Sequence, residues 1–365
     1  MIYVSIILVI FTMIWFVLKL RNMDIWIFSY IRGLLARLFS EKSTMTHVYF
    51  CLADHYEPFH RNATTEVARN RVNKWVKNYP LVASRHSDSF GRAPQHTYFY
   101  PEEEYDEEII NKISVLCKDN LGDVEIHLHH DDDTEENLRN TLNRFKTLLH
   151  DKHDLLRKNS KGEIVYGFIH GNWALDNSRK DGKWCGIDNE LDILIETGCA
   201  YDMTMPSAPS DTQTRIINKI YYAKEDGLCK SHDKGRELSV STKKEKDEIL
   251  MIQGPLTLNW RSRKFGIMPR IESGEISYDA RSSLQRAKLW GDCGVSINGA
   301  DDHIFIKLHC HGVTDKNLKM FYDENGLDKL WTDLESVYRD KSNYKLHYVT
   351  AWEMYEIINK LSSGK

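Results

Sequence analysis

Several diagnostic features are missing from this sequence of 365 residues. It has no excess of basic charge, because 49 Lys and Arg stand against 53 Asp and Glu, a formal net charge of -4. Nucleic-acid-binding proteins normally show a basic face or stripe, so we expect no nucleic-acid partner. The chain also lacks an internal repeat and a low-complexity tract. Its hydrophobic fraction of 41% is that of a globular protein with a large core.

The seven cysteines lack the spacing of a zinc-ribbon or redox motif. Their number is odd, and no two of them form a Cys-x-x-Cys pair. Cys51, Cys199 and Cys310 stand in apolar contexts that favour buried, inert thiols. Such cysteines fit a reducing compartment.

The amino terminus is an apolar run near the short end of what spans a bilayer. Residues 2–18 are apolar except for Ser5 and Thr12, and no small-residue cleavage site follows, which disfavours a removable signal peptide. Basic residues follow the run, so the remainder is expected in the cytoplasm, with an extracytoplasmic location as the alternative. We predict a membrane anchor over 1–21 and, over 22–44, an amphipathic linker suited to the headgroup layer.

From residue 45 onward, short β-rich runs alternate with polar segments of helical spacing. Such alternation indicates a parallel sheet with crossover helices. The range 45–361 therefore predicts an α/β barrel domain, complete or distorted. Segment 219–247, rich in Lys and Glu, interrupts the rhythm and is expected to be an insertion or flap. The predicted strands are 47–53, 96–100, 123–129, 164–170, 200–204, 256–258, 304–309 and 346–349, and the predicted helices include 65–79, 106–118, 134–152 and 327–338.

Histidines and carboxylates gather where four of these strands end. Parallel α/β folds place their functional sites at the carboxyl ends of strands, so these side chains are expected at one rim. One polar strand end has ordinary explanations, but four at one rim indicate a site. The four ends read Asp54-His-Tyr-Glu57, Glu125-Ile-His-Leu-His-His-Asp-Asp-Asp133, His170-Gly-Asn-Trp173 and His309-Cys-His311.

The strand 123–129 carries the most specific pattern. His127 and His129 share one face, because side chains alternate with a period of two. Imidazoles beside carboxylates offer the donors that a divalent transition metal binds at about 2 Å. The aspartates 131–133 also suit a helix start, and we expect at least one of them to cap it. The pattern predicts a metal site, with a solvated polar loop as the plainer alternative.

The order of these motifs resembles that of the polysaccharide deacetylases (NodB-homology proteins, carbohydrate esterase family 4). The segment 52–58 stands where the family has two aspartates before Gly-Pro, and 125–133 stands where it has Glu-Ile-x-x-His-Thr-x-x-His. The apolar strand 304–309 ends in Leu-His, as the family's last catalytic motif does. The resemblance implies a distorted (β/α)7-8 barrel and a metal-dependent hydrolase that removes an N-acyl group from a carbohydrate. The family's Arg-Pro-Pro-Tyr-Gly motif is absent, and 170–173 stands in its place.

The resemblance assigns the metal and the catalytic groups position by position. It implies a divalent metal, most simply Zn²⁺, bound by His55, His129 and Asp133, which exchanges the family's Asp-His-His order. Two nitrogens and one carboxylate still suit a catalytic zinc with an open position. His127 is an alternative ligand. The catalytic residues implied are Asp54 as the base and His309 as the acid that protonates the leaving amine.

Further residues near the strand ends are expected to contact the sugar. His311 shares a face with His309 and is an alternative acid or a substrate contact. The polar loop that begins at Asp202 could meet sugar hydroxyls, although it also reads as a turn connection. Exposed indoles can stack on sugar rings, but most tryptophans are part of a core. The predicted substrate-binding residues are His170, Asn172, Trp173, Asp202 and His311.

Two other functions remain open from the sequence. A glycoside hydrolase on a related barrel would use paired carboxylates without a metal. A barrel that has lost its original triad could instead bind a glycan or an assembly partner without catalysis. Metal content separates these possibilities, because neither alternative requires a bound ion.

Overall fold

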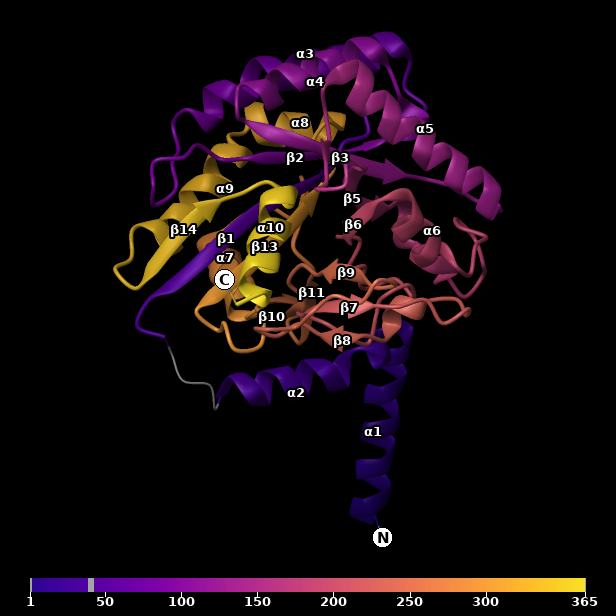
Figure 1. Cartoon of the computed structure of the whole chain (residues 1–365). Coiled ribbons are helices and arrows are strands. Elements are labelled where there is room, and N and C mark those ends of the chain that lie inside the picture. The colour runs from indigo at the N-terminus through magenta and orange to yellow at the C-terminus, as the bar shows by residue number, and fades with distance from the viewer. Residues whose placement is uncertain (1, 39–42, 365) are drawn as a thin grey trace.

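A mostly parallel sheet of 12 strands forms the centre of the fold in the computed structural model, which describes residues 2–38 and 43–364 (Figure 1). The strand order is β12-β13-β1-β2-β3-β5-β6-β9-β7-β8, with β14 paired to β1 and β4 paired to β5. These strands are β1 (Thr46–His55), β2 (His96–Pro101), β3 (Gly122–Leu128), β4 (Arg157–Lys158), β5 (Ile164–His170), β6 (Cys199–Asp202), β7 (Ile220–Ala223), β8 (Arg236–Glu237), β9 (Ile249–Ile252), β12 (Glu275–Ile276), β13 (His303–Cys310) and β14 (Tyr344–Tyr348).

Helices cover the sheet, and several of the predicted ones are present with slightly different ends. A separate hairpin, β10 (Thr257–Lys264) and β11 (Met268–Glu272), contains the predicted strand 256–258, which therefore lies outside the main sheet. The helices are α1 (Ile2–Leu20), α2 (Ile27–Leu38), α3 (Thr65–Ala83), α4 (Glu107–Lys118), α5 (Glu135–His153), α6 (Glu190–Thr197), α7 (Leu284–Asp292), α8 (Asp315–Leu318), α9 (Gly326–Leu334) and α10 (Ala351–Ser362).

The α/β class is confirmed, but closure into a barrel is not found. Within 2–38 and 43–364, no strand pairing joins β12 at one end of the sheet to β8 at the other. The segment 219–247 explains one of these ends. It supplies β7 and β8, and β7 runs antiparallel to both β8 and β9. What the sequence predicts as an insertion or flap therefore contributes two strands to the edge of the sheet.

Both faces of the central strands are buried, and the alternation of side chains divides the interior into two apolar cores. Phe50 and Leu52 of β1 belong to one core, together with Trp75 of α3. Cys51 and Ala53 point the other way and belong to a second core that includes residues of α10. This parity decides which side chains at the end of each strand can meet.

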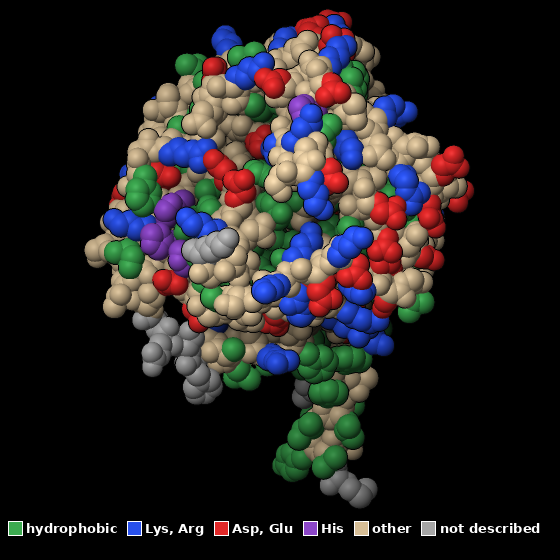
Figure 2. Space-filling model, in the orientation of Figure 1, with side chains coloured by type: hydrophobic (Ala, Val, Ile, Leu, Met, Phe, Trp, Pro, Cys, Tyr) green, Lys and Arg blue, Asp and Glu red, His purple; other side chains and the backbone are tan. Residues whose placement is uncertain are grey.

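The amino-terminal helix projects from the domain, as Figures 1 and 2 show, and its surface is apolar. Among the described residues, α1 is the one helix long and apolar enough to cross a membrane, and no residue of its window Tyr3–Leu20 is fully buried in the domain. The next residues are fixed to the domain. Met23, Trp26 and Tyr30 form an apolar cluster with side chains of the body of the domain, and Arg37 donates to the carbonyl of Cys293 at 3.0 Å. Residues 39–42 of the predicted linker lie outside the described residues.

Candidate metal centre

Three histidines surround one glutamate oxygen at the carboxyl ends of β1, β3 and β13. Oε1 of Glu57 lies 3.5 Å from Nε2 of His127 and 3.6 Å from Nε2 of His129. The same oxygen lies 3.7 Å from Nε2 of His311. Glu57 and His127 are buried, whereas the side chains of His129 and His311 are 29% and 28% exposed. The cluster is therefore buried on one side and open to solvent on the other.

His55 belongs to the same group. Ligand atoms of His55, Glu57 and His127 lie within 4.8 Å of one another. The His55 ring centroid is 4.8 Å from those of both His127 and His311. The structure thus brings together three of the predicted ligands, His55, His127 and His129.

Strand parity explains this convergence. In β1 the side chain of His55 follows Ala53 on the face of the second core, and in β3 the side chain of His127 lies opposite the buried Ile126 and Leu128. Lys307, His309 and His311 alternate with the core residues Ile306, Leu308 and Cys310 of β13. Because β13, β1, β2 and β3 are parallel neighbours, the side chains on this face meet at the carboxyl ends of the strands.

The donor set fits a divalent metal ion. Nδ1 of His127 donates to the carbonyl of Ile169 at 2.7 Å, so Nε2 carries the lone pair, and this buried Nε2 has no hydrogen-bond partner. Nδ1 of His129 faces the Glu103 carboxylate at 2.5 Å, the outer partner that metal-binding histidines usually have. Atoms that share a tetrahedral Zn²⁺ at about 2.0–2.1 Å lie roughly 3.3 Å apart, close to the separations around Glu57.

The charge states of His55, His127 and Glu57 suit metal binding, whereas the pKa of His129 is raised because the Glu103 carboxylate outweighs the effect of burial. Burial lowers the pKa of His55 well below its ordinary value, and the neighbouring imidazoles of His127 and His311 lower it further. Burial likewise lowers the pKa of His127. Burial alone would raise the pKa of Glu57, but the nearby imidazoles of His127, His60 and His311 outweigh it and hold the pKa well below its usual range. Neutral imidazoles and an ionised carboxylate are the forms that coordinate a metal.

The structure places Asp54 away from this cluster. Its side chain lies on the same face of β1 as Leu52, where it is fully buried. Oδ1 accepts the backbone N–H of Gly312 at 2.6 Å, and Oδ2 lies 2.9 Å from Nε2 of His96. Adjacent residues of a strand point to opposite faces, so Asp54 and His55 cannot both face the cluster.

Asp133 also lies apart from the predicted ligands. Its Oδ1 accepts the N–H of Thr134 at 2.7 Å and a side-chain N–H of Asn137 at 2.7 Å, so it helps to start α5. Its Oδ2 is 3.1 Å from Nδ1 of His130. The N-cap of α5 is Thr134, whose hydroxyl accepts the backbone N–H of Asn137, so the aspartates 131–133 precede the cap and none of them is the predicted capping residue.

The side chains of His309 and Trp173 border the cluster. The ring centroid of His309 is 6.1 Å from that of His55, and the indole centroid of Trp173 is 6.1 Å from His55 and 6.4 Å from His309. Burial lowers the pKa of His309 well below its ordinary value, and nearby Lys307 and His311 add to this. Trp173 and its neighbour Asn172 have positive φ, so a strained turn presents the indole to the site.

Two predicted substrate contacts are buried elsewhere. His170 is fully buried, and its Nε2 faces the carboxylate of Glu190 at 3.5 Å. Asp202 accepts the backbone N–H and the hydroxyl of Thr204 at 2.9 and 2.7 Å, and burial raises its pKa to about 7. Both side chains are fully buried, so neither reaches the solvent-exposed side of the histidine cluster.

Sequence reasoning did not identify Glu57 and His311 as ligands. Glu57 follows His55 with the parity of β1, and His311 follows His309 with the parity of β13. The alternation of side chains therefore indicates that both residues face the same side as His55 and His309. The motif Asp-Asp-Gly-Pro assigns its two acids to positions 54 and 55, so Glu57 lies outside the positions that the motif specifies.

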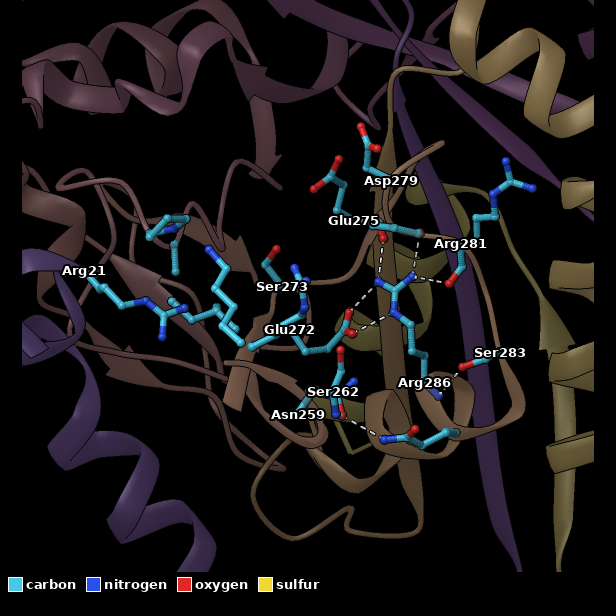
Figure 3. Close-up of a pocket in the computed structure, with 17 residues that line it drawn as sticks. Arg21, Asn259, Ser262, Glu272, Ser273, Glu275, Asp279, Arg281, Ser283 and Arg286 are labelled. Atoms are coloured by element: carbon cyan, nitrogen blue, oxygen red, sulfur yellow. Dashed lines mark hydrogen bonds and ion pairs between the residues drawn. The ribbon is translucent and has the colours of Figure 1, made fainter. Parts of the chain in front are cut away.

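A large cavity lies next to β12, the short strand that pairs with the end of β13. It has a volume of about 770 Å³ and is bordered by Arg21, by the β10–β11 hairpin and by residues 273–286. Figure 3 shows Glu272 and Arg286 paired in its wall, at 2.7 Å, with Arg21 entering from the side of α1. Glu275, which also borders the cavity, pairs with His309 in the sheet. The cavity is therefore bordered by the residue that directly follows α1 and by β12, the strand that pairs with the end of β13.

The chain has a distant likeness to the polysaccharide deacetylases. One similar structure is a candidate polysaccharide deacetylase from Mycobacterium smegmatis, with a TM-score of 0.47 and 10% identity over 89% of this chain and 94% of that chain. Another is the Xyl-CE4 domain of a multidomain xylanase from the hindgut metagenome of Trinervitermes trinervoides, with a TM-score of 0.35 and 10% identity over 86% and 92%. No protein-family model matches the sequence, and no curated protein matches it.

Proposed function

We propose that this protein is a metal-dependent hydrolase that removes an N-acetyl or related N-acyl group from a sugar during polysaccharide biosynthesis or modification. The observation that carries the proposal is the convergence of three imidazole Nε2 atoms on one oxygen of Glu57 at 3.5–3.7 Å. Glu57, His127, His129 and His311 would hold the ion, with His55 beside them. A divalent ion supplies Lewis-acid chemistry, which polarises a carbonyl and makes water more acidic.

His55 is the group placed to accept a proton from the attacking water. Its ring faces the cluster, and its lowered pKa keeps the imidazole neutral, the form that can act as a base. Asp54 has both oxygens engaged on the opposite face of β1. We assign Asp54 a positioning role, because its contact with the Gly312 N–H fixes the turn that follows His311.

His309 and His55 form a pair through which one proton can pass to the leaving amine. Hydrolysis of an amide consumes one water, and the proton that the water loses must reach the nitrogen that departs. The two rings lie on neighbouring parallel strands with centroids 6.1 Å apart. A proton accepted within this pair and returned to the amine completes the reaction.

Trp173 and the membrane anchor define how the substrate would be presented. The indole borders the histidine cluster and offers a flat apolar surface on which a sugar ring can stack. We infer that α1 anchors the protein in a membrane with its domain on the cytoplasmic side, because Lys19 and Arg21 follow the apolar run. A lipid-linked or nucleotide-linked glycan fits an enzyme held at that surface.

Metal analysis and acetate release together test the proposal. We expect the full-length protein to release acetate from one or more of a panel of N-acetylated sugars and to lose this activity after chelation. His127→Ala and Glu57→Gln should each lose metal from this site and lose turnover. His150→Ala is the matched control, because that histidine lies on α5 with its Nδ1 3.8 Å from Asp151, and it belongs to neither histidine group. Activity that survives chelation would refute the metal requirement and favour a glycoside hydrolase.

A further inference from the structure

A second group of metal-binding side chains lies next to the first and takes no part in the proposed reaction. His130, His170, Cys185 and Glu190 offer ligand atoms that all lie within 4.8 Å of one another. Oε1 of Glu190 is 3.3 Å from Nε2 of His130, and Oε2 is 3.5 Å from Nε2 of His170. Sγ of Cys185 is 3.4 Å from the same Oε2. We propose that this group binds a structural Zn²⁺ ion.

His170 directs an unpaired nitrogen into the centre of the group. Its Nδ1 lies 2.5 Å from the carbonyl oxygen of Gly171, so Nδ1 is the donor and Nε2 carries a lone pair. Nε2 has no hydrogen-bond partner although the ring is fully buried. A lone pair that faces a buried carboxylate oxygen is unfavourable, and a cation between the two atoms removes this conflict.

His130 has the outer partner that a metal-binding histidine needs. Its Nε2 faces Glu190, and its Nδ1 lies 3.1 Å from Oδ2 of Asp133. A carboxylate behind an imidazole fixes the tautomer and the ring orientation in metal sites. Asp133 is itself held by the N–H groups of Thr134 and Asn137. Asp133 therefore supports the second group, although the motif pattern predicted it as a ligand of the first.

The donor chemistry indicates zinc and a structural role. Two imidazole nitrogens, one thiolate and one carboxylate make a four-coordinate set of the kind that zinc accepts. His170, Cys185 and Glu190 are fully buried, so the group has no open side for a substrate. Structural zinc sites are closed in this way, whereas catalytic sites keep one position free.

An ion in this group would fasten an irregular loop to the sheet. Residues 171–189 connect β5 to α6 and contain little regular structure beyond short 3-10 turns. Five non-glycine residues of this loop have positive φ, a conformation that such residues rarely adopt: Asn172, Trp173, Asp176, Asn177 and Trp184. The four ligands come from the end of β3, the end of β5, the loop and the start of α6. The ion would therefore hold the turn that presents Trp173 to the histidine cluster.

Cobalt substitution in the full-length protein tests this site, because the second group contains a sulfur ligand and the first contains none. Thiolate bound to Co²⁺ gives a near-ultraviolet charge-transfer band that nitrogen and oxygen ligands do not give. We expect the band in the wild type and its loss in Cys185→Ser. We expect it to persist in Cys229→Ser, whose cysteine is exposed elsewhere, and in His127→Ala, which alters the first group.

Each outcome of the cobalt experiment either supports or overturns the proposed zinc site. A cobalt-loaded wild type without the band overturns the proposal, and this measurement needs no variant. A band that persists in Cys185→Ser places the thiolate elsewhere, such as at Cys310, and also overturns it. If Cys185→Ser does not fold, X-ray absorption of the zinc form gives the second readout: sulfur in the zinc shell supports the site, and its absence refutes it. His127→Ala should abolish acetate release and keep the band, so the two proposals can fail separately.

Discussion

Asp54 and His55 are neighbours in the chain but lie in different environments. Asp54 is held by hydrogen bonds on the face of β1 that packs against the core containing Trp75 of α3. His55 faces the histidine cluster on the other side. Motif matching alone cannot separate two adjacent residues, because a shift of one position along a strand turns a side chain to the other face. The alternation of His127 and His129 was predictable because both lie within one strand pattern. Glu57 has the parity of His55, but it lies beyond the end of β1, so the strand pattern alone indicated its direction without fixing its position.

Substitution at positions 54 and 55 should separate the two possible bases. His55→Ala should keep metal and lower turnover by about 10²–10⁴-fold, the usual contribution of a general base. Asp54→Asn should retain turnover within about tenfold, because the asparagine oxygen can still accept the Gly312 N–H. Steady-state rates and metal content of the two variants are the measurements. A larger loss of turnover in Asp54→Asn than in His55→Ala would restore Asp54 as the base.

Gly171 occupies a position where no side chain fits. A Cβ there would lie 2.2 Å from Cδ2 of His129 and 2.8 Å from the carbonyl of Leu128. We expect Gly171→Ala to displace His129 and to weaken metal binding by roughly tenfold to a hundredfold, as loss of a supporting contact usually does. Titration with a competing chelator measures this change. Gly33→Ala in α2 is the control, and equal affinities in both variants would contradict the placement of His129.

At the scale of elements, the regular strands and helices followed from periodicity, whereas the loops that complete the site did not. The helices α3, α4 and α5 begin close to their predicted residues, since Thr64, Asp106 and Thr134 cap them. The edge of the sheet was less predictable, because β7 and β8 arise in a polar segment whose pairing with β9 is non-local. Loop 171–189 could not be predicted from pattern, since its shape rests on positive φ values and on buried polar contacts.

Trp173 gives an element-scale prediction about the substrate. Trp173→Ala should raise KM by about tenfold, equivalent to about 1.4 kcal/mol of binding, with a smaller effect on kcat. Trp184→Ala is the matched control, because that indole lies in the same loop but stacks on Arg179 at 4.0 Å. Steady-state kinetics on an N-acetylated sugar would show the difference. Equal effects of the two substitutions would mean that Trp173 does not touch the sugar.

At the scale of the whole molecule, α1 and α2 differ in how they relate to the domain. Most described side chains of α1 are exposed, and Leu18 near its end is partly buried, whereas Met23, Trp26 and Tyr30 are buried in a cluster with Leu256 and Leu258. We expect a chain that begins at residue 22 to keep its melting temperature and to leave the membrane fraction. A chain that begins at residue 45 should lose several kcal/mol of stability, since each large apolar side chain contributes about 1.5–3 kcal/mol when buried. Thermal denaturation of the two truncations measures this, and equal stability would show that 22–44 is a passive tether.

The attachment of the chain directly after α1 has a consequence for substrate choice. Arg21 and Asn22 donate to the carbonyls of Pro269 and Pro209, so the domain is held within two residues of the last apolar turn. In the proposed membrane-anchored enzyme, an active site attached this rigidly would stay at a fixed height above the lipid surface. It could not move toward or away from the membrane to reach its substrate. Glycans would then be sorted by reach: a sugar carried on a spacer too short or too long would pass the histidines untouched.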